Sequence, residues 1–215
     1  MSDAVNVRRR YDASGRQEQA RLARARVLAV ARDQFLADGY SATTVPGIAR
    51  AAGVSAQGVY KAFGSKAALV KAVFDVAIAG DDEPLTMLER ESLSRVREEA
   101  DPYTKLELYA QFVGDTAPRH APIQLLIRAA AAADADAAQV WAQLSAERLT
   151  GMTMFARDLS PHLRAGVTTD NARDILWAHS SVELWELLVT QRRWSTRQHA
   201  DHLARTLTHT LLPTR

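Results

Sequence analysis

The sequence predicts an all-α protein, and three observations support this fold class. No stretch shows the sustained alternation of apolar and polar residues that marks a half-buried strand. Alanine, leucine, arginine, glutamine and glutamate, which all favour helices, dominate the chain. Apolar residues recur instead at steps of three and four, the spacing that gathers them on one face of a helix.

The composition narrows the class of protein further. The chain has 215 residues, of which 47% are hydrophobic and 24% charged, as in ordinary globular proteins. No apolar run approaches the roughly 18 residues of a membrane span, and no signal-peptide pattern opens the chain. We therefore expect a cytoplasmic protein with no membrane partner. The absence of cysteine excludes disulfides, thiol nucleophiles and thiolate metal sites.

The first predicted helix spans residues 17–37, and residues 1–16 before it are expected to form a flexible basic arm. Asp38 and Gly39 end the helix at a position suited to a left-handed cap. The apolar residues at helical spacing within it are Leu22, Ala25, Val27, Leu28, Ala31, Phe35 and Leu36.

Two short helices follow, joined by a tight turn that contains glycine. Thr44 is a suitable N-cap for a helix over Val45–Ala52, with a proline in its first turn, where no backbone donor is needed. Ser55 caps a second helix over Ala56–Phe63. Helices joined in this way form a helix-turn-helix, in which the second helix enters the major groove of DNA.

A fourth helix, capped by Ser65, completes the first domain. The helical pattern breaks at residues 80–84, where a charge run and a proline favour an exposed loop. We therefore predict a helix-turn-helix domain over residues 17–80 and a larger helical domain over residues 81–215. The helices predicted in the second domain span about residues 104–117, 119–133, 135–159, 170–191 and 196–212, and they are separated by Pro118, Ser160-Pro161 and Trp194-Ser195.

Basic charge is concentrated in the first third of the chain. Residues 1–71 contain 12 Lys and Arg against 5 Asp and Glu, whereas the remaining residues contain 15 against 20. A local positive field attracts a polyanion even though the net charge is only +2. Arg8, Arg9 and Arg10 are therefore candidates for phosphate contacts, the alternative being a solvated, disordered tail.

Many residues around the helix-turn-helix match one family pattern at the correct spacing: Gly39, Tyr40, Thr43, Thr44, Val45, Ile48, Ala49, Ala51, Ala52, Gly53, Val54, Ser55, Tyr60, Phe63 and Lys66. Over roughly residues 21–75 the chain thus resembles the tetracycline-repressor (TetR) family. One departure is Ala62, where relatives often carry histidine. The resemblance implies a three-helix DNA-binding domain, followed by a larger helical domain that dimerises through its last two long helices and holds an inducer among its central ones.

The helix over Ala56–Phe63 exposes the residues that can reach base edges. Gln57 can pair with adenine through two hydrogen bonds, and Lys61 can donate to guanine or to a nearby phosphate. Ala56 and Gly58 carry little hydrogen-bonding information, but their small size permits close approach to DNA. These four positions are the candidates for reading sequence.

A second set of residues is expected to fix the position of the protein on DNA. By resemblance, Tyr60, Lys66 and Thr44 hold the phosphate backbone, which sets register rather than sequence. Ser55, which caps the recognition helix, is also expected to contact DNA. The alternatives are a half-buried core aromatic for Tyr60 and a solvated lysine for Lys66.

The last two predicted helices are expected to form a dimer interface. Segment 170–191 carries two adjoining apolar stripes, which is more than packing on one side requires, and segment 196–212 adds leucines at four-residue steps. The alternative is that both helices fill the core of a single chain. The predicted interface residues are Val182, Trp185, Val189, Leu203, Leu207 and Leu211.

Aromatic and thioether side chains of the second domain suit a pocket for a small apolar or aromatic ligand, although most of them are expected to be plain core. His179 could orient a ligand oxygen, the alternative being a satisfied core histidine. His199 and His202 share a helix face without a third ligand, so we expect them at the surface and expect neither a metal nor another cofactor. The candidate pocket residues are Tyr109, Phe112, Ile127, Trp141, Leu144, Met152, Met154, Phe155, Trp177 and His179.

Together these features predict a transcriptional regulator. We expect a homodimeric repressor that binds a palindromic double-stranded operator and is released by a small-molecule inducer. An enzyme would need a nucleophile with its base, paired carboxylates or a metal site, and the sequence shows none. A nonspecific nucleoid-type protein would share the basic segment but has no use for a large apolar second domain.

Overall fold

The computed structural model describes residues 3–80 and 91–215, with the side chains of residues 17–80 and 93–215. These residues contain no β-strand, so the all-α prediction is confirmed. The chain divides into two compact units, Met1–Val73 and Phe74–Arg215. The loop predicted as the domain boundary lies mostly outside the described residues, and the division between the units comes earlier, within the fourth helix.

The first unit is built around helix α1 (Asp3–Ala42), which begins earlier than the predicted residue 17. No proline interrupts the chain before Gly39, whose φ of +79° turns the backbone as the sequence predicts. The side chains of Arg8, Arg9 and Arg10 lie outside the described residues. Their contact with phosphate, like the flexibility of the arm, therefore stays a prediction.

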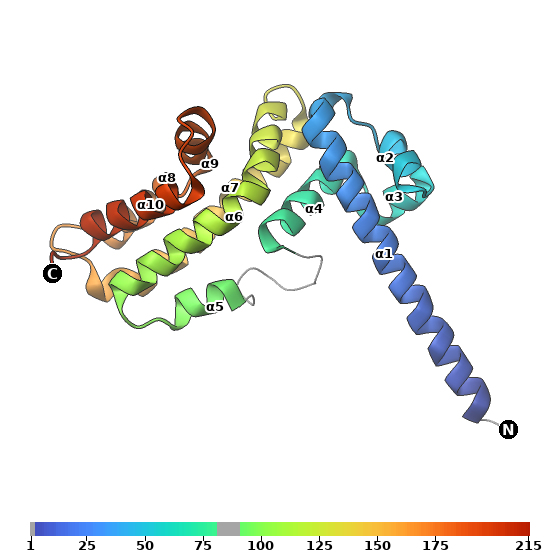
Figure 1. Ribbon diagram of the computed structural model, residues 1–215, viewed down its shortest axis with the longest axis horizontal. Coiled ribbons are helices and arrows are strands. Elements are labelled where there is room, and N and C mark those ends of the chain that lie inside the picture. Colours follow the sequence, from blue (N-terminus) through green and yellow to red (C-terminus); the bar gives the residue numbers. More distant parts are fainter. Residues whose placement is uncertain (1–2, 81–90) are drawn as a thin grey trace. The chain divides into compact units, whose positions relative to one another are not determined.

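Helices α2 (Val45–Ala52) and α3 (Ala56–Phe63) have the predicted bounds and lie beside the C-terminal half of α1 (Figure 1). Helix α4 (Lys66–Ala79) follows. Two-turn helices are unstable alone, so α2 and α3 depend on a shared core with α1 and α4. Ala51 is exposed, and Phe63 is half-buried. The core is formed by Val27, Leu28, Ala31, Phe35, Ile48, Ala52, Val59, Leu69 and Val70.

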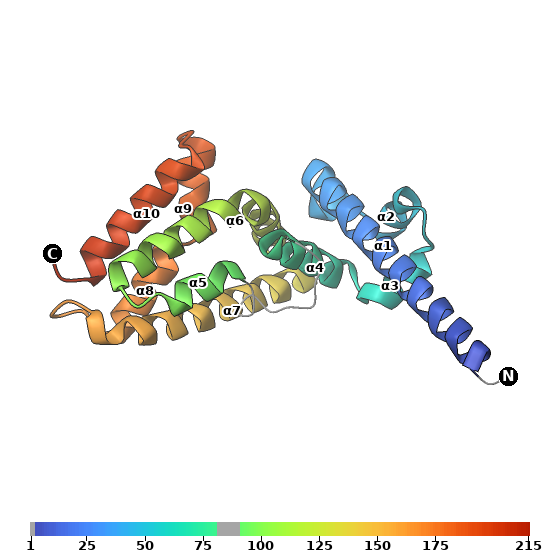
Figure 2. The same cartoon turned by 60° about the horizontal axis from the view of Figure 1, so that its bottom comes forward.

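In the second unit, α10 runs alongside α6, and α7 packs against α8 (Figures 1 and 2). The core lies among these helices and includes Leu106, Leu159, Leu176 and Leu203. The described elements are α5 (Glu91–Glu98), α6 (Pro102–Ala130), α7 (Ala135–Leu159), the short 3-10 helix η2 (Ser160–His162), α8 (Thr169–His179), α9 (Val182–Trp185), the π-helical η3 (Glu186–Gln191) and α10 (Thr196–Leu211).

Helix α6 is continuous where two helices were predicted. Pro118 lies inside it and does not end it, although an internal proline removes a hydrogen bond and costs about 3 kcal/mol. On either side of this proline, Ala117 and Ala121 pack on Val182 and Trp185 of α9. The burial of this apolar cluster stabilises the helix past the proline, which the sequence around residue 118 alone cannot reveal.

The predicted helix over residues 170–191 is broken in the middle. The Ser180 hydroxyl donates to the carbonyl of Leu176 at 2.7 Å and closes α8, while the Ser181 hydroxyl accepts from the N–H of Leu184 at 3.3 Å and caps α9. Serine hydroxyls compete with the helical backbone in this way. Helix α5 was not predicted, although the three-residue spacing of Leu93 and Val96 is a signal for it.

Among the described residues, none of the helices is both long enough and apolar enough to cross a bilayer.

Candidate functional site

The helix-turn-helix is fixed by two side-chain caps and a glycine turn. The Thr44 hydroxyl accepts from the N–H of Gly47 at 3.2 Å, and the Ser55 hydroxyl accepts from the N–H of Gly58 at 3.0 Å. Between the helices, Gly53 has a φ of +69°, a left-handed conformation that glycine adopts without strain. These local interactions set the ends of α2 and α3 and therefore the direction of α3.

Helix α3 has one buried side and one exposed side. Val59 is buried in the core of the first unit, which fixes the orientation of the helix. Gln57, Gly58 and Lys61 are exposed, as the sequence predicts for residues that read bases, and Ala56 is half-buried. The structure therefore places a rigid helix whose outer face carries an amide and an ammonium group at the surface of the unit.

Tyr60 belongs to the exposed side of α3. Its side chain is 47% exposed, so it is not the half-buried core aromatic that was the alternative. Its hydroxyl is available for a phosphate oxygen, and this contact stays a prediction.

Lys66 has a structural contact that the sequence did not indicate. Its ammonium donates to the backbone carbonyl of Tyr40 at 3.0 Å and lies 4.1 Å from the centre of the Tyr40 ring. Lys66 is therefore not a solvated lysine, because it ties the start of α4 to the end of α1. An ammonium has three donors, so phosphate contact remains open to this side chain.

Sequence reasoning also missed a role for Arg24. Its guanidinium lies 4.5 Å from the centre of the Phe63 ring, where it joins α1 to the last turn of α3. Such a cation–π contact stabilises by about 0.5–1 kcal/mol when exposed. Phe63 matches the family pattern, but nothing in the sequence pairs its ring with a residue of α1.

Part of the predicted pocket comes together in the second unit. The rings of Tyr109 and Phe155 are 4.9 Å apart, and the Tyr109 hydroxyl lies 3.4 Å from the Met152 sulfur. Burial raises the pKa of Tyr109 above its ordinary value, so the phenol stays protonated. The Ser180 hydroxyl is 3.9 Å from the same sulfur. Trp177 is 38% exposed, and its ring lies 4.6 Å from the guanidinium of Arg148.

The remaining pocket candidates are placed differently. Ile127 and Leu144 are fully buried core residues, Trp141 and His179 are half-buried, and Met154 is 49% exposed on the outside of α7. A cavity of about 240 Å³ is lined by Phe112 together with residues of α4, α5 and α6. Of the predicted pocket residues, Phe112 lines this cavity, and a shared ligand pocket for the others stays a prediction.

The residues predicted for the dimer interface lie mostly in the core of one chain. Leu203, Leu207 and Leu211 face the core between α6 and α8, and Val182 and Trp185 pack on α6. Their burial within the chain, at 9% exposure or less, leaves almost no area for a partner. Helical periodicity shows that a face is covered, but it does not show by what.

The histidines of α10 also differ from expectation. His199 is 1% exposed rather than at the surface, and neither of its ring nitrogens has a hydrogen-bond partner among the described residues. Burial and the charge of His202 lower its pKa, so the ring is neutral. The same two causes lower the pKa of His179.

Comparison with known proteins agrees with this geometry. Residues 27–73 match the family described as bacterial regulatory proteins, tetR family, and this segment runs from α1 into α4. No curated protein matches the sequence.

Solved structures share the fold over nearly the whole chain. NalD of Pseudomonas aeruginosa, the secondary repressor of the MexAB-OprM multidrug efflux pump, is 21% identical with a TM-score of 0.70, over 92% of this chain and 100% of NalD. A transcriptional regulator of Saccharomonospora viridis in complex with choline is 17% identical with a TM-score of 0.66, over 89% of this chain and 98% of that regulator. The fatty acid degradation regulator FadR of Bacillus halodurans is 16% identical with a TM-score of 0.67, over 86% of this chain and 93% of FadR.

TetR-family regulators are DNA-binding transcription factors and not enzymes. The matched segment contains both capped helices and the turn between them, and the larger unit shares the fold of solved family members. The N-terminal part of this chain is therefore similar to the DNA-binding domain of the tetR family, and the chain as a whole shares the fold of solved transcriptional regulators.

Proposed function

We propose that the protein is a homodimeric repressor in the cytoplasm that binds a palindromic operator and leaves it when a small apolar or aromatic molecule binds the larger unit. The observation that carries this proposal is the exposed face of α3, on which Gln57 and Lys61 stand free of the core. Two such helices about 34 Å apart would reach successive major grooves on one side of the duplex.

The larger unit supports a ligand-responsive function. Tyr109, Met152 and Phe155 bring a phenol, a thioether and an aromatic ring together, which suits an apolar ligand with one polar group. Among the similar structures, one regulator is in complex with choline and another is a regulator of fatty acid degradation. We extend to this chain only the general property of binding a small molecule.

The release mechanism follows from the position of α4. This helix begins in the first unit and ends in the second. A ligand that favours one arrangement of the larger unit would shift α4 and so change the separation of the two recognition helices. A dimer that no longer fits successive grooves loses the affinity contributed by its second half-site.

Selection from random duplex DNA tests this function. The purified full-length chain should enrich one inverted repeat and should bind it at least about 1,000-fold more tightly than unrelated DNA at physiological salt. Enrichment of no sequence, with equal affinity for every duplex, would instead identify a nonspecific DNA-binding protein. A variant with Gln57→Ala and Lys61→Ala is the matched control, because both residues are exposed on α3 and neither of them caps the helix.

A further inference from the structure

The cavity lined by residues of α4, α5 and α6 combines apolar side chains with a charged edge. Ile78, Leu108 and Phe112 are half-buried in its lining, whereas Arg95 and Arg119 are exposed. Its volume of about 240 Å³ lies near the lower end of the range for ligand sites, so it suits a small organic molecule. All of its lining residues belong to the second unit.

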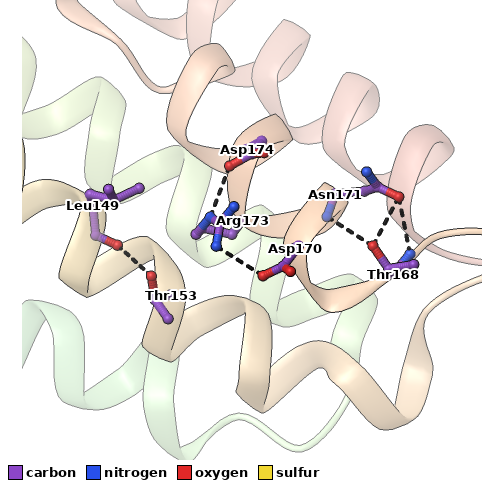
Figure 3. Close-up of polar contacts among 7 residues, drawn as sticks. All are labelled: Leu149, Thr153, Thr168, Asp170, Asn171, Arg173 and Asp174. Carbon is purple, nitrogen blue, oxygen red and sulfur yellow. Dashed lines mark hydrogen bonds and ion pairs between the residues drawn. The ribbon is translucent and has the colours of Figure 1, made fainter.

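The two arginines of this lining differ from a typical arginine on the surface of the second unit. In α8, Arg173 donates to the carboxylates of Asp170 and Asp174, each at 2.8 Å (Figure 3). Within the described part of the chain, neither Arg95 nor Arg119 is paired with a carboxylate in this way. Both guanidinium groups can therefore accept an anionic partner.

Arg119 donates to backbone carbonyls instead. Its Nε donates to the carbonyl of Ala77 near the end of α4 at 3.1 Å, and its Nη1 donates to the carbonyl of Asp115 at 3.0 Å. The last carbonyls of a helix have no partner within the helix, and the helix dipole favours a cation beside them. Arg119 therefore holds the C-terminal end of α4 on α6.

The free donors of Arg119 suit a carboxylate. A guanidinium has five N–H donors, and the described residues provide no acceptor for Nη2. The edge formed by Nε and Nη2 matches the two oxygens of a carboxylate, and this charged pair is stronger than a bond to a neutral carbonyl. A carboxylate that takes this edge displaces the Ala77 carbonyl from Nε.

We infer that the ligand of the proposed function is a small aliphatic or aryl carboxylate, whose carboxylate binds Arg95 and Arg119 while its apolar body fills the cavity. This inference rests on the proposed function and names the class of its ligand. Two arginines and one aspartate give the lining a net positive charge, which favours an anion over a cation. Exchange of the Ala77 carbonyl for the ligand would free the end of α4, the helix whose shift is proposed to release DNA.

Isothermal titration calorimetry on the full-length chain tests the charge of the ligand. The probes are straight-chain carboxylates from butyrate to decanoate, together with benzoate and phenylpropionate, each compared with the neutral amide and the amine of the same skeleton. At least one carboxylate should bind, and its amide should bind at least about tenfold more weakly, because it loses the charged pair. The amine should not bind.

Two results of this titration overturn the inference. One is an amide or amine that binds as tightly as its carboxylate, and the other is a panel in which no carboxylate binds at millimolar concentration. Neither result removes the proposed DNA-binding function, whose failure appears separately, when the chain enriches no inverted repeat.

Glutamine variants test the two arginines one at a time. Arg95→Gln and Arg119→Gln should each weaken binding of the carboxylate at least about tenfold and leave binding of the amide unchanged. Arg157→Gln is the matched control, because Arg157 is an exposed arginine of α7 outside the cavity lining. Unchanged carboxylate affinity in both cavity variants overturns the site. If Arg119→Gln does not fold, Arg95→Gln alone decides.

Release of DNA distinguishes the two arginines from each other. At a saturating carboxylate concentration, Arg95→Gln should still leave the operator, because Arg119 can still exchange the Ala77 carbonyl for the ligand. Arg119→Gln should release the operator incompletely even when the ligand is bound, as measured by fluorescence anisotropy of labelled DNA. Equal release by both saturated variants overturns the exchange at Arg119.

Discussion

At the scale of single residues, Gln57 and Lys66 are expected to affect DNA binding in different ways. Gln57 is exposed on α3, whereas Lys66 is bound to the Tyr40 carbonyl. Gln57→Ala should relax the preference at one base pair of each half-site by about 1–3 kcal/mol. Lys66→Ala should weaken binding to every sequence and flatten the dependence of log K on log salt by about one unit per subunit.

Both variants can be measured by fluorescence anisotropy on the selected operator and on single-base variants of it. Because Lys66 also joins α1 to α4, thermal unfolding of Lys66→Ala must show a folded first unit at the temperature of the assay. If the two variants change specificity and salt dependence alike, the division between base contact and phosphate contact is wrong.

His120 makes the stability of the second unit depend on pH. Its ring packs edge-on against Phe74 at 5.7 Å, and burial lowers its pKa from 6.5 to about 4. The unfolded chain therefore binds a proton that the folded chain does not, so stability is complete above pH 6.5 and falls as the pH approaches 4. Urea unfolding should show a loss of about 2–3 kcal/mol from this group between pH 7.5 and pH 4.5.

The non-titrating variant His120→Gln isolates this contribution. Burial also lowers the pKa of His179 and His199, so some acid sensitivity should remain in the variant. The difference in unfolding free energy between pH 7.5 and pH 4.5 should nevertheless be clearly smaller than in the wild-type chain. An unchanged difference would mean that His120 titrates normally in the folded protein.

At the scale of secondary-structure elements, two helical glycines should respond oppositely to alanine. A Cβ atom at Gly114 would lie 2.9 Å from the Ala200 Cβ, where α6 meets α10, while a Cβ at Gly151 in α7 has open space. Gly114→Ala should destabilise the second unit by about 1–3 kcal/mol through overpacking. Gly151→Ala should stabilise it by up to about 1 kcal/mol through helix propensity.

Chemical unfolding followed by far-ultraviolet circular dichroism compares the two glycine variants directly. Gly151→Ala is the internal control for the substitution itself, because both variants add one methyl group to a long helix. Equal changes in unfolding free energy would contradict the close contact between α6 and α10.

The helices also show which parts of the structure can be predicted from residues that are close together in the sequence. Helices α2 and α3 have the predicted ends because their caps, Thr44 and Ser55, act within three residues. The course of α6 through Pro118 depends instead on contacts with α9, far along the chain. Local signals therefore predict helix ends well, and they fail where packing against a distant segment determines whether a helix continues.

At the scale of the whole molecule, the same distinction separates the expected DNA-binding face from the leucines of α10. The face that is expected to contact DNA could be predicted because it belongs to one short helix, α3. The buried side of α3 is recognisable from its apolar residue Val59. The placement of the α10 leucines could not be predicted, because their pattern fits either a partner or the chain's own core. The packing of α6 on α10 puts these leucines in the core of the chain, and the sequence does not specify that pairing.

In the proposed dimer, two α3 helices read two half-sites at once. The most direct test compares the affinity of the full-length chain for its selected inverted repeat with that for the same repeat lengthened by five base pairs, half a helical turn, at the centre. We predict a loss of at least about 100-fold, because the half-sites then lie on opposite sides of the duplex. Equal affinity for both DNAs would contradict simultaneous reading by a symmetric dimer.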